Sequence, residues 1–160
     1  DVVITWENPA TTVFIEMKYG SPLSATTIHN NGDKGFPSDQ LIRNARIGLW
    51  ENGWFDEKLL FDIPSRDFIL MLVTPSDGTP LVQEYRNPDR LRAAIPQGEK
   101  LSKLPKGPFI GELSYNGIVQ ILKNQRKWFT KSERILVDDL TEYLGFKLSQ
   151  LRGSNGRGHG

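Results

Sequence analysis

The fold expected of this chain is decided by its first eighteen residues, which read DVVITWENPATTVFIEMK. β-Branched and aromatic residues dominate two runs, Asp1–Trp6 and Thr12–Lys18. The segment between them, Glu7–Thr11, contains Asn8-Pro9, a pair that favours a turn. The pattern therefore predicts a β-hairpin whose turn is centred near Asn8-Pro9.

Charged side chains interrupt the second strand of this hairpin. Residues two apart share one face of a strand, so Glu16 and Lys18 should project together while Met17 points the opposite way. With the turn centred near residues 8 and 9, Asp1 lies opposite Glu16 on that same face. Charge inside an otherwise apolar run is unfavourable unless it is paired or liganded. The hairpin thus predicts two carboxylates and one ammonium at one end of the sheet.

Two carboxylates a few ångströms apart suit a hard divalent cation. Mg²⁺ takes one or two protein carboxylates and keeps water or substrate phosphate as its other ligands. An ammonium beside it can hold or deprotonate an attacking water, or balance charge on a transferring phosphoryl group. A half-exposed hairpin with ordinary surface charges is the alternative explanation of the same residues.

These residues resemble the PD-(D/E)xK nuclease superfamily, which has the restriction-endonuclease-like fold. Asp1 and Glu16-Met17-Lys18 match its Asp…(Asp/Glu)-x-Lys signature, and FIEMKYGS resembles its active-site strand. The resemblance implies that Asp1 and Glu16 hold Mg²⁺ or Mn²⁺, with the Met17 backbone carbonyl as a further ligand. It also implies that Lys18 positions or activates water for in-line attack on a phosphodiester.

The resemblance extends into the next expected helix and has two departures. Gln40 matches the glutamine that many members direct toward the site, which makes it a further candidate catalytic residue. Asn44, four residues later, stands where the RecB-like branch has tyrosine. The chain begins at the motif Asp1, so we expect a fragment or trimmed chain without the preceding proline, first strand and N-terminal helix.

A helix is expected over residues 38–51, with Ser38 as its N-cap. Gln40, Arg43 and Asn44 would share one face of it. If that face looks at the hairpin, Gln40 can orient water or phosphate and Arg43 can contact a nucleic-acid backbone; a solvated helix face is the alternative. The Gly- and Pro-rich segment before the helix contains His29, for which a solvated loop position is favoured over a catalytic one.

The run Asp67–Thr74 is continuously apolar, which is typical of a strand buried on both faces. Hairpin, helix and buried strand together predict a β-α-β crossover after the hairpin. The expected fold class is α/β with a mixed sheet, a restriction-endonuclease-like core with additional C-terminal helices. The 160 residues fit one domain, expected over 1–151, and a disordered tail over 152–160.

The last helix is expected from Lys131 to Leu151. Apolar residues at helical spacing predict one buried stripe along it, made of Leu136, Leu140, Tyr143, Leu144, Leu148 and Leu151.

The densest basic stretch comes just before that helix and contains Lys123, Arg126, Lys127 and Lys131. Such side chains contact phosphates, and the neighbouring Trp128 could stack on a base. A solvated helix end with its aromatic residues tucked underneath is the alternative.

The composition narrows the class of protein. With 38% hydrophobic and 24% charged residues it is that of a soluble globular domain, and a net charge of +1 gives no global attraction to nucleic acid. The absence of cysteine excludes a disulfide framework and a Cys-based zinc site. The absence of cysteine is compatible with the cytoplasmic location that we expect. No apolar run approaches the length of a membrane span, so we expect no membrane association.

Two functions remain open from the sequence. The first is a metal-dependent endonuclease or exonuclease that hydrolyses phosphodiester bonds in DNA. The second is a catalytically inactive module that keeps the fold and binds nucleic acid or protein. The intact Asp1, Glu16 and Lys18 favour the nuclease. An uncovered hairpin would expose apolar surface near Val2 and Ile4, so pairing with a second copy is a further expectation.

Overall fold

The structure, a computed structural model, describes residues 1–19, 23, 39–55, 66–101 and 109–155. The expected loop histidine, His29, and the expected cap, Ser38, lie outside this part of the chain. Its strands are β1 (Val2–Glu7), β2 (Ala10–Met17), β3 (Asp67–Thr74) and β4 (Ile110–Ser114). Its helices are α1 (Gln40–Glu51), α2 (Pro80–Tyr85), α3 (Pro88–Ala94), η2 (Gly98–Lys100), α4 (Tyr115–Gln125), η3 (Arg126–Trp128) and α5 (Lys131–Asn155).

The described strands form one mixed sheet in the order β1-β2-β3-β4. β1 and β2 are antiparallel, whereas β2, β3 and β4 are parallel neighbours. The predicted sequence of hairpin, helix and parallel strand is therefore confirmed, and the fold is α/β with a mixed sheet. The closer likeness to a restriction endonuclease stays a prediction.

The hairpin has the predicted register. Val2 pairs with Ile15, and the ladder continues to the turn at residues 8 and 9. Asp1 precedes β1, and one further step along the same ladder would place it opposite Glu16. Because side chains alternate between the faces of a strand, Asp1 belongs to the side of Val3, which lines a hollow against α1.

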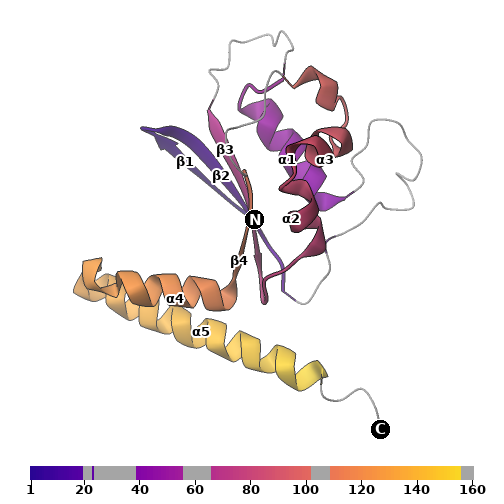
Figure 1. Ribbon diagram of the computed structural model, residues 1–160. Helices are drawn as coiled ribbons and strands as arrows, with labels where there is room; N and C mark the ends of the chain where they lie inside the picture. The colour runs from indigo at the N-terminus through magenta and orange to yellow at the C-terminus, as the bar shows by residue number, and fades with distance from the viewer. Residues whose placement is uncertain (20–22, 24–38, 56–65, 102–108, 156–160) are drawn as a thin grey trace.

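Helices α1, α2 and α3 cover one face of the sheet, and α4 and α5 lie at its other side (Figure 1). The larger core forms under α1–α3, where β3 contributes Phe68, Leu70 and Leu72. Leu41, Ile42, Ala45 and Leu49 of α1 form the buried stripe of that helix.

The N-cap of helix α1 lies one residue later than predicted. Asp39 is the N-cap, and its carboxylate accepts hydrogen bonds from the N–H of Ile42 at 3.0 Å and from the hydroxyl of Tyr85 at 2.6 Å. An aspartate side chain reaches the N–H groups of a first helical turn as well as serine does. The second bond ties the start of α1 to the end of α2.

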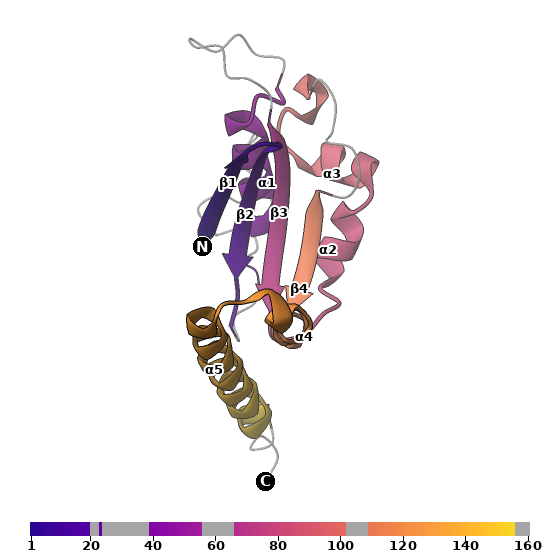
Figure 2. The same cartoon turned by 90° about the vertical axis from the view of Figure 1, so that its left-hand side faces the viewer.

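The opposite face of the sheet is covered only near the carboxyl ends of its parallel strands. There Val73 packs with Tyr115, Val119 and Leu144, while Met71 remains half-buried. The prediction that β3 is buried on both faces is therefore correct for one face and only partly correct for the other. The reason is that α4 and α5 turn away from the sheet instead of crossing it (Figure 2).

The predicted buried stripe of α5 is wrong for half of its members. Leu144 is buried and Leu148 and Leu151 are half-buried, but Leu136, Leu140 and Tyr143 are exposed. Val137, one residue along from Leu136, is buried in its place. Helix α5 is apolar on two adjacent faces, and periodicity alone does not show which face its neighbour covers.

Helix α5 also continues to Asn155, four residues beyond the predicted end, so the expected disordered tail is wrong over 152–155. No proline follows Leu151 to stop the helix, and a glycine within it costs only about 1 kcal/mol. Residues 156–160 lie outside the described part.

Candidate active site

Glu16 lies near the carboxyl end of β2 and is only 1% exposed. Its Oε1 atom accepts a hydrogen bond from Gln40 Nε2 at 2.6 Å and lies 2.9 Å from Lys18 Nζ. Its Oε2 atom accepts a hydrogen bond from Asn44 Nδ2 at 2.9 Å. We call Glu16, Lys18, Gln40 and Asn44 the Glu16 cluster. It joins β2 to α1 through a buried carboxylate with at least one donor on each of its oxygens.

The two amide donors reach Glu16 because they stand one helical turn apart on α1. Gln40 is the first residue of α1, and the Asp39 cap fixes the direction in which the helix enters. Of the three residues on the predicted face, Gln40 and Asn44 therefore contact the hairpin. Arg43 is half-buried on the same helix.

Lys18 is more accessible than its partner. Its side chain is 20% exposed and lines a hollow of about 360 Å³ with Leu72, Thr74 and Thr79 among its other walls. Its backbone is held on both sides, because its N–H donates to the Val73 carbonyl at 2.8 Å and its own carbonyl accepts from the Tyr115 hydroxyl at 3.2 Å. The ammonium therefore stands between a buried carboxylate and a space open to a ligand.

Tyr115 supports this end of β2 from the opposite face of the sheet. Its ring stacks on Tyr19 with centroids 6.4 Å apart. Burial first, and the neighbouring Tyr143 and Tyr19 phenols second, raise the pKa of the Tyr115 hydroxyl. Both effects favour the protonated hydroxyl, which is the form that donates to the Lys18 carbonyl.

The hydrogen-bond donors around Glu16 leave one acceptor position of its carboxylate open. A carboxylate has about four acceptor positions, and the described residues fill two on Oε1 and one on Oε2. The fourth position, the exposed Asp1 and the Met17 backbone carbonyl are hard oxygen donors of the kind that Mg²⁺ or Mn²⁺ accepts. The described residues contain no group of three or more His, Cys, Asp or Glu that could hold a metal ion, so water or substrate oxygens would complete the shell.

Glu112 of β4 lies in the same row of the sheet as Glu16, with Leu72 between them. Two strand spacings separate their backbones by about 9–10 Å, and the Glu112 carboxylate accepts hydrogen bonds from the loop after β3, not from the Glu16 cluster. Burial alone would raise the pKa of Glu112, but hydrogen bonds from the Thr79 hydroxyl, the Gly78 and Thr79 N–H groups and the Thr74 hydroxyl lower it overall. Glu112 therefore fastens the loop between β3 and α2, which borders the hollow next to Lys18.

The basic stretch is not brought to the Glu16 cluster. Lys123, Arg126, Lys127 and Lys131 lie around the turn from α4 into α5, at the end of α4 that points away from the sheet (Figure 1). Arg126 is paired with Asp138 at 2.7 Å, and the Lys127 ammonium stands 5.2 Å from the centre of the Trp128 ring.

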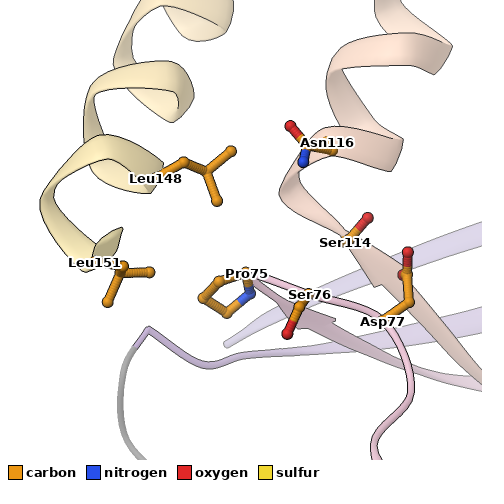
Figure 3. Close-up of a pocket in the computed structure, with 7 residues that line it drawn as sticks. All are labelled: Pro75, Ser76, Asp77, Ser114, Asn116, Leu148 and Leu151. Carbon is orange, nitrogen blue, oxygen red and sulfur yellow. The ribbon is translucent and has the colours of Figure 1, made fainter. Parts of the chain in front are cut away.

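A second hollow of about 520 Å³ opens at the carboxyl ends of β3 and β4, between the loop after β3 and the helices α4 and α5 (Figure 3). Figure 3 shows Leu148 and Leu151 of α5 on one side, with Asp77, Ser114 and Asn116 on the other. Its described lining residues include no basic side chain, so we assign it no phosphate-binding role.

Comparison with protein-family models, with curated proteins and with solved structures gives no match for this chain. Among the described helices, none combines the length and the apolar character needed to cross a membrane. The resemblance to the PD-(D/E)xK superfamily consequently stands on the motif residues themselves.

Two residues of this region were not among the sequence candidates. Asn44 could have been found, because it follows Gln40 by four residues on a face expected to look at Glu16. Glu112 carries a weaker signal, a charge inside the short apolar run from Phe109 to Leu113, and its partners come from a loop more than thirty residues earlier.

Proposed function

We propose that the protein is a metal-dependent nuclease that hydrolyses phosphodiester bonds in DNA. The observation that supports this most is a buried carboxylate and an accessible ammonium two residues apart at the end of β2, in a hairpin whose ladder would bring Asp1 opposite Glu16 if it continued by one residue. A buried charge is unfavourable without a partner, and a patch of this kind at the carboxyl edge of parallel strands is a common place for a ligand.

In this proposal Asp1, Glu16 and the Met17 carbonyl hold Mg²⁺ or Mn²⁺. When bound, the cation would polarise the phosphoryl oxygens and neutralise charge that develops on them. Asp1 and Glu16 have to approach within about 4–6 Å to share it, and this separation stays a prediction.

Lys18 would act on the water or on the developing charge, because it alone in the Glu16 cluster joins Glu16 to the 360 Å³ hollow. Glu16 would hold that ammonium in place while Lys18 keeps its other donor positions for water or phosphate. Gln40 and Asn44 would orient the Glu16 carboxylate by occupying both of its oxygens, which fixes the plane in which it can bind a cation.

DNA would be the partner, bound through phosphate contacts from Arg43 near the cluster. The more distant Lys123, Arg126, Lys127 and Lys131 would add non-specific contacts only to a substrate long enough to reach the helical hairpin of α4 and α5. A cytoplasmic location belongs to the same proposal.

One observation favours the inactive binding module instead. The charge of Glu16 is already balanced by Lys18 and two amides, so the cluster is self-sufficient as a structural link between β2 and α1. In that case Asp1 would have no role, and removal of Lys18 would affect stability without affecting any reaction.

Cleavage of supercoiled and linear DNA with Mg²⁺ or Mn²⁺ tests the proposal, with EDTA expected to abolish it. Glu16→Ala should lose both metal affinity, measured by calorimetric titration, and turnover. Lys18→Ala should leave metal affinity largely intact and lower turnover by about 10²–10³, the usual effect of losing one electrostatic contact to a transition state. Gln40→Ala should be milder, because it only orients groups that are already held.

Glu84→Gln, at an exposed position of α2, is the matched control and should cleave like the parent. If Glu16→Ala and Lys18→Ala also cleave like the parent, the activity does not come from this cluster and the binding module becomes the better explanation.

A further inference from the structure

Helix α5 carries two apolar rows side by side. One row is buried or half-buried and contains Val137, Leu144 and Leu148. The other contains Leu136, Leu140 and Tyr143, which follow at intervals of four and three residues and are 42–67% exposed. Intervals of four and three are the spacing by which one helix packs against another along its length.

Two more exposed side chains widen the second row. Ile135 and Phe146 are each 57% exposed and lie on the adjacent side of α5, with Asp139 between them and Tyr143. Lys131, Asp138 and Glu142 follow at helical spacing on the remaining side, whereas Lys147 lies within the second row, with its ammonium 5.5 Å from the centre of the Tyr143 ring. A helix that is apolar over so much of its circumference is typical of one with neighbours on more than one side.

The described structure covers the second row at one point, where the Tyr19 hydroxyl donates to the Lys147 carbonyl at 3.1 Å and the Lys147 ammonium lies between the Tyr19 and Tyr143 rings. α4 packs against α5, and in both views α5 runs clear of the sheet over most of its length (Figures 1 and 2). Apart from this contact, the second row faces outward along a helix of 25 residues, which is about 37 Å long.

We propose that a second copy of this chain covers the exposed row of α5. The two α4–α5 hairpins would pair about a two-fold axis and form a four-helix bundle, with each copy burying the same surface against the other. The proposal does not depend on the proposed nuclease activity.

The exposed area agrees with the size of such a contact. The five side chains are open over roughly half of their surface, about 100 Å² each and on the order of 500 Å² together. Because protein interfaces are about 55–65% apolar, this apolar area corresponds to about 800 Å² per copy, the usual size of a stable interface.

Charge favours a second copy over a membrane surface as the occupant. A net charge of +1 gives two copies little mutual repulsion. A helix that lies on a lipid surface usually has lysine and arginine on its polar side, whereas Asp138 and Glu142 accompany Lys131 on the polar side of α5.

Sedimentation velocity over about 1–100 μM tests the proposal directly. The chain should sediment as a dimer, and Leu136→Glu with Leu140→Glu should sediment as a monomer with an unchanged circular dichroism spectrum. The control is Ile47→Glu, an isoleucine 54% exposed on α1, which should leave the dimer intact. A parent chain that stays monomeric at every concentration, or a double variant that stays dimeric, would overturn the proposal.

Single cysteines give an independent measurement, because the chain contains no cysteine of its own. Leu140→Cys should form a covalent dimer rapidly under oxidising conditions at low micromolar concentration, since it lies near the middle of α5. Ile47→Cys should not. Equal rates for the two variants, or no cross-link for Leu140→Cys, would count against the pairing of these helices.

Discussion

Substitutions in the Glu16 cluster should affect the stability of the protein and its activity to different extents. Replacing Glu16 by leucine keeps a side chain of similar size in a site that is 1% exposed, but leaves Gln40, Asn44 and Lys18 without their acceptor. A hydrogen bond to a charged group contributes about 1.5–3 kcal/mol net, so the two amides account for about 3–6 kcal/mol. Lys18 can turn its ammonium into water and adds little.

Two effects reduce this loss. Gln40 and Asn44 are only half-buried, so water replaces part of what Glu16 supplied. Burial of the leucine side chain offsets about 1.5–3 kcal/mol. We expect Glu16→Leu to lower the free energy of unfolding by about 2–3 kcal/mol, which corresponds to a fall of roughly 5–10 °C in Tm for a chain of this length.

The matched variant replaces the whole cluster, with Glu16→Leu, Gln40→Leu, Asn44→Leu and Lys18→Met together. Exchange of a buried polar network for well-packed apolar side chains is often neutral or stabilising. The quadruple variant should therefore regain most of the stability that the single variant loses, while neither variant binds a cation or cleaves DNA.

Urea unfolding followed by the fluorescence of the four tryptophans measures both variants under the same conditions. A single variant as stable as the parent would show that the three donors do not depend on Glu16. A quadruple variant no more stable than the single one would show that the loss comes from packing and not from unpaired donors.

Two further predictions concern the helices and the loop that pack around the sheet. Gly48→Ala should destabilise the fold by about 1–3 kcal/mol, because its new Cβ would lie 2.0 Å from the Phe68 ring. Gly145→Ala meets no neighbour within 4 Å and should stabilise α5 by about 0.5–1 kcal/mol, and thermal unfolding of the two variants measures both effects. The lowered pKa of Glu112 means that its ionised form stabilises the folded state above its ordinary pKa of 4.5, and that this contribution disappears as the pH falls through the folded value. The difference in urea midpoint between the parent and Glu112→Gln should accordingly shrink between pH 6 and pH 3, and a difference that is independent of pH would contradict the assignment.

Local sequence patterns were sufficient to predict two kinds of feature. One is contact between residues that are close in sequence, and the other is the face of a strand on which a side chain lies. The hairpin register followed from the turn, and the placement of Glu16 and Lys18 on one face followed from the period of a strand. The donors on α1 were foreseeable as a face, although only the structure shows that Asn44 reaches Glu16.

The features that the sequence could not predict depend on how the helices and strands pack against one another. Leu136 and Val137 are equally apolar, and only the position of α4 decides that Val137 is buried and Leu136 exposed. The anchoring of Glu112 depends on a loop that β3 and β4 bring to it across the sheet. The separation of the basic stretch from the Glu16 cluster depends on the direction in which α4 leaves the sheet, which no local pattern encodes.

The exposure of β1 determines how fast its amide hydrogens exchange with water. Every residue of β1 is exposed, and β1 is held by its ladder to β2 and by Arg66, which donates to the Glu7 carboxylate and the Trp6 carbonyl. Such an edge opens at a small fraction of the global free energy, whereas β2 and β3 exchange only in rarer openings. Because Asp1 directly precedes β1, a cation shared by Asp1 and Glu16 would fasten the free end of this strand. Its affinity would then include the free energy of keeping β1 closed, and slower exchange at Val2 and Val3 would report cation binding even where no substrate is turned over.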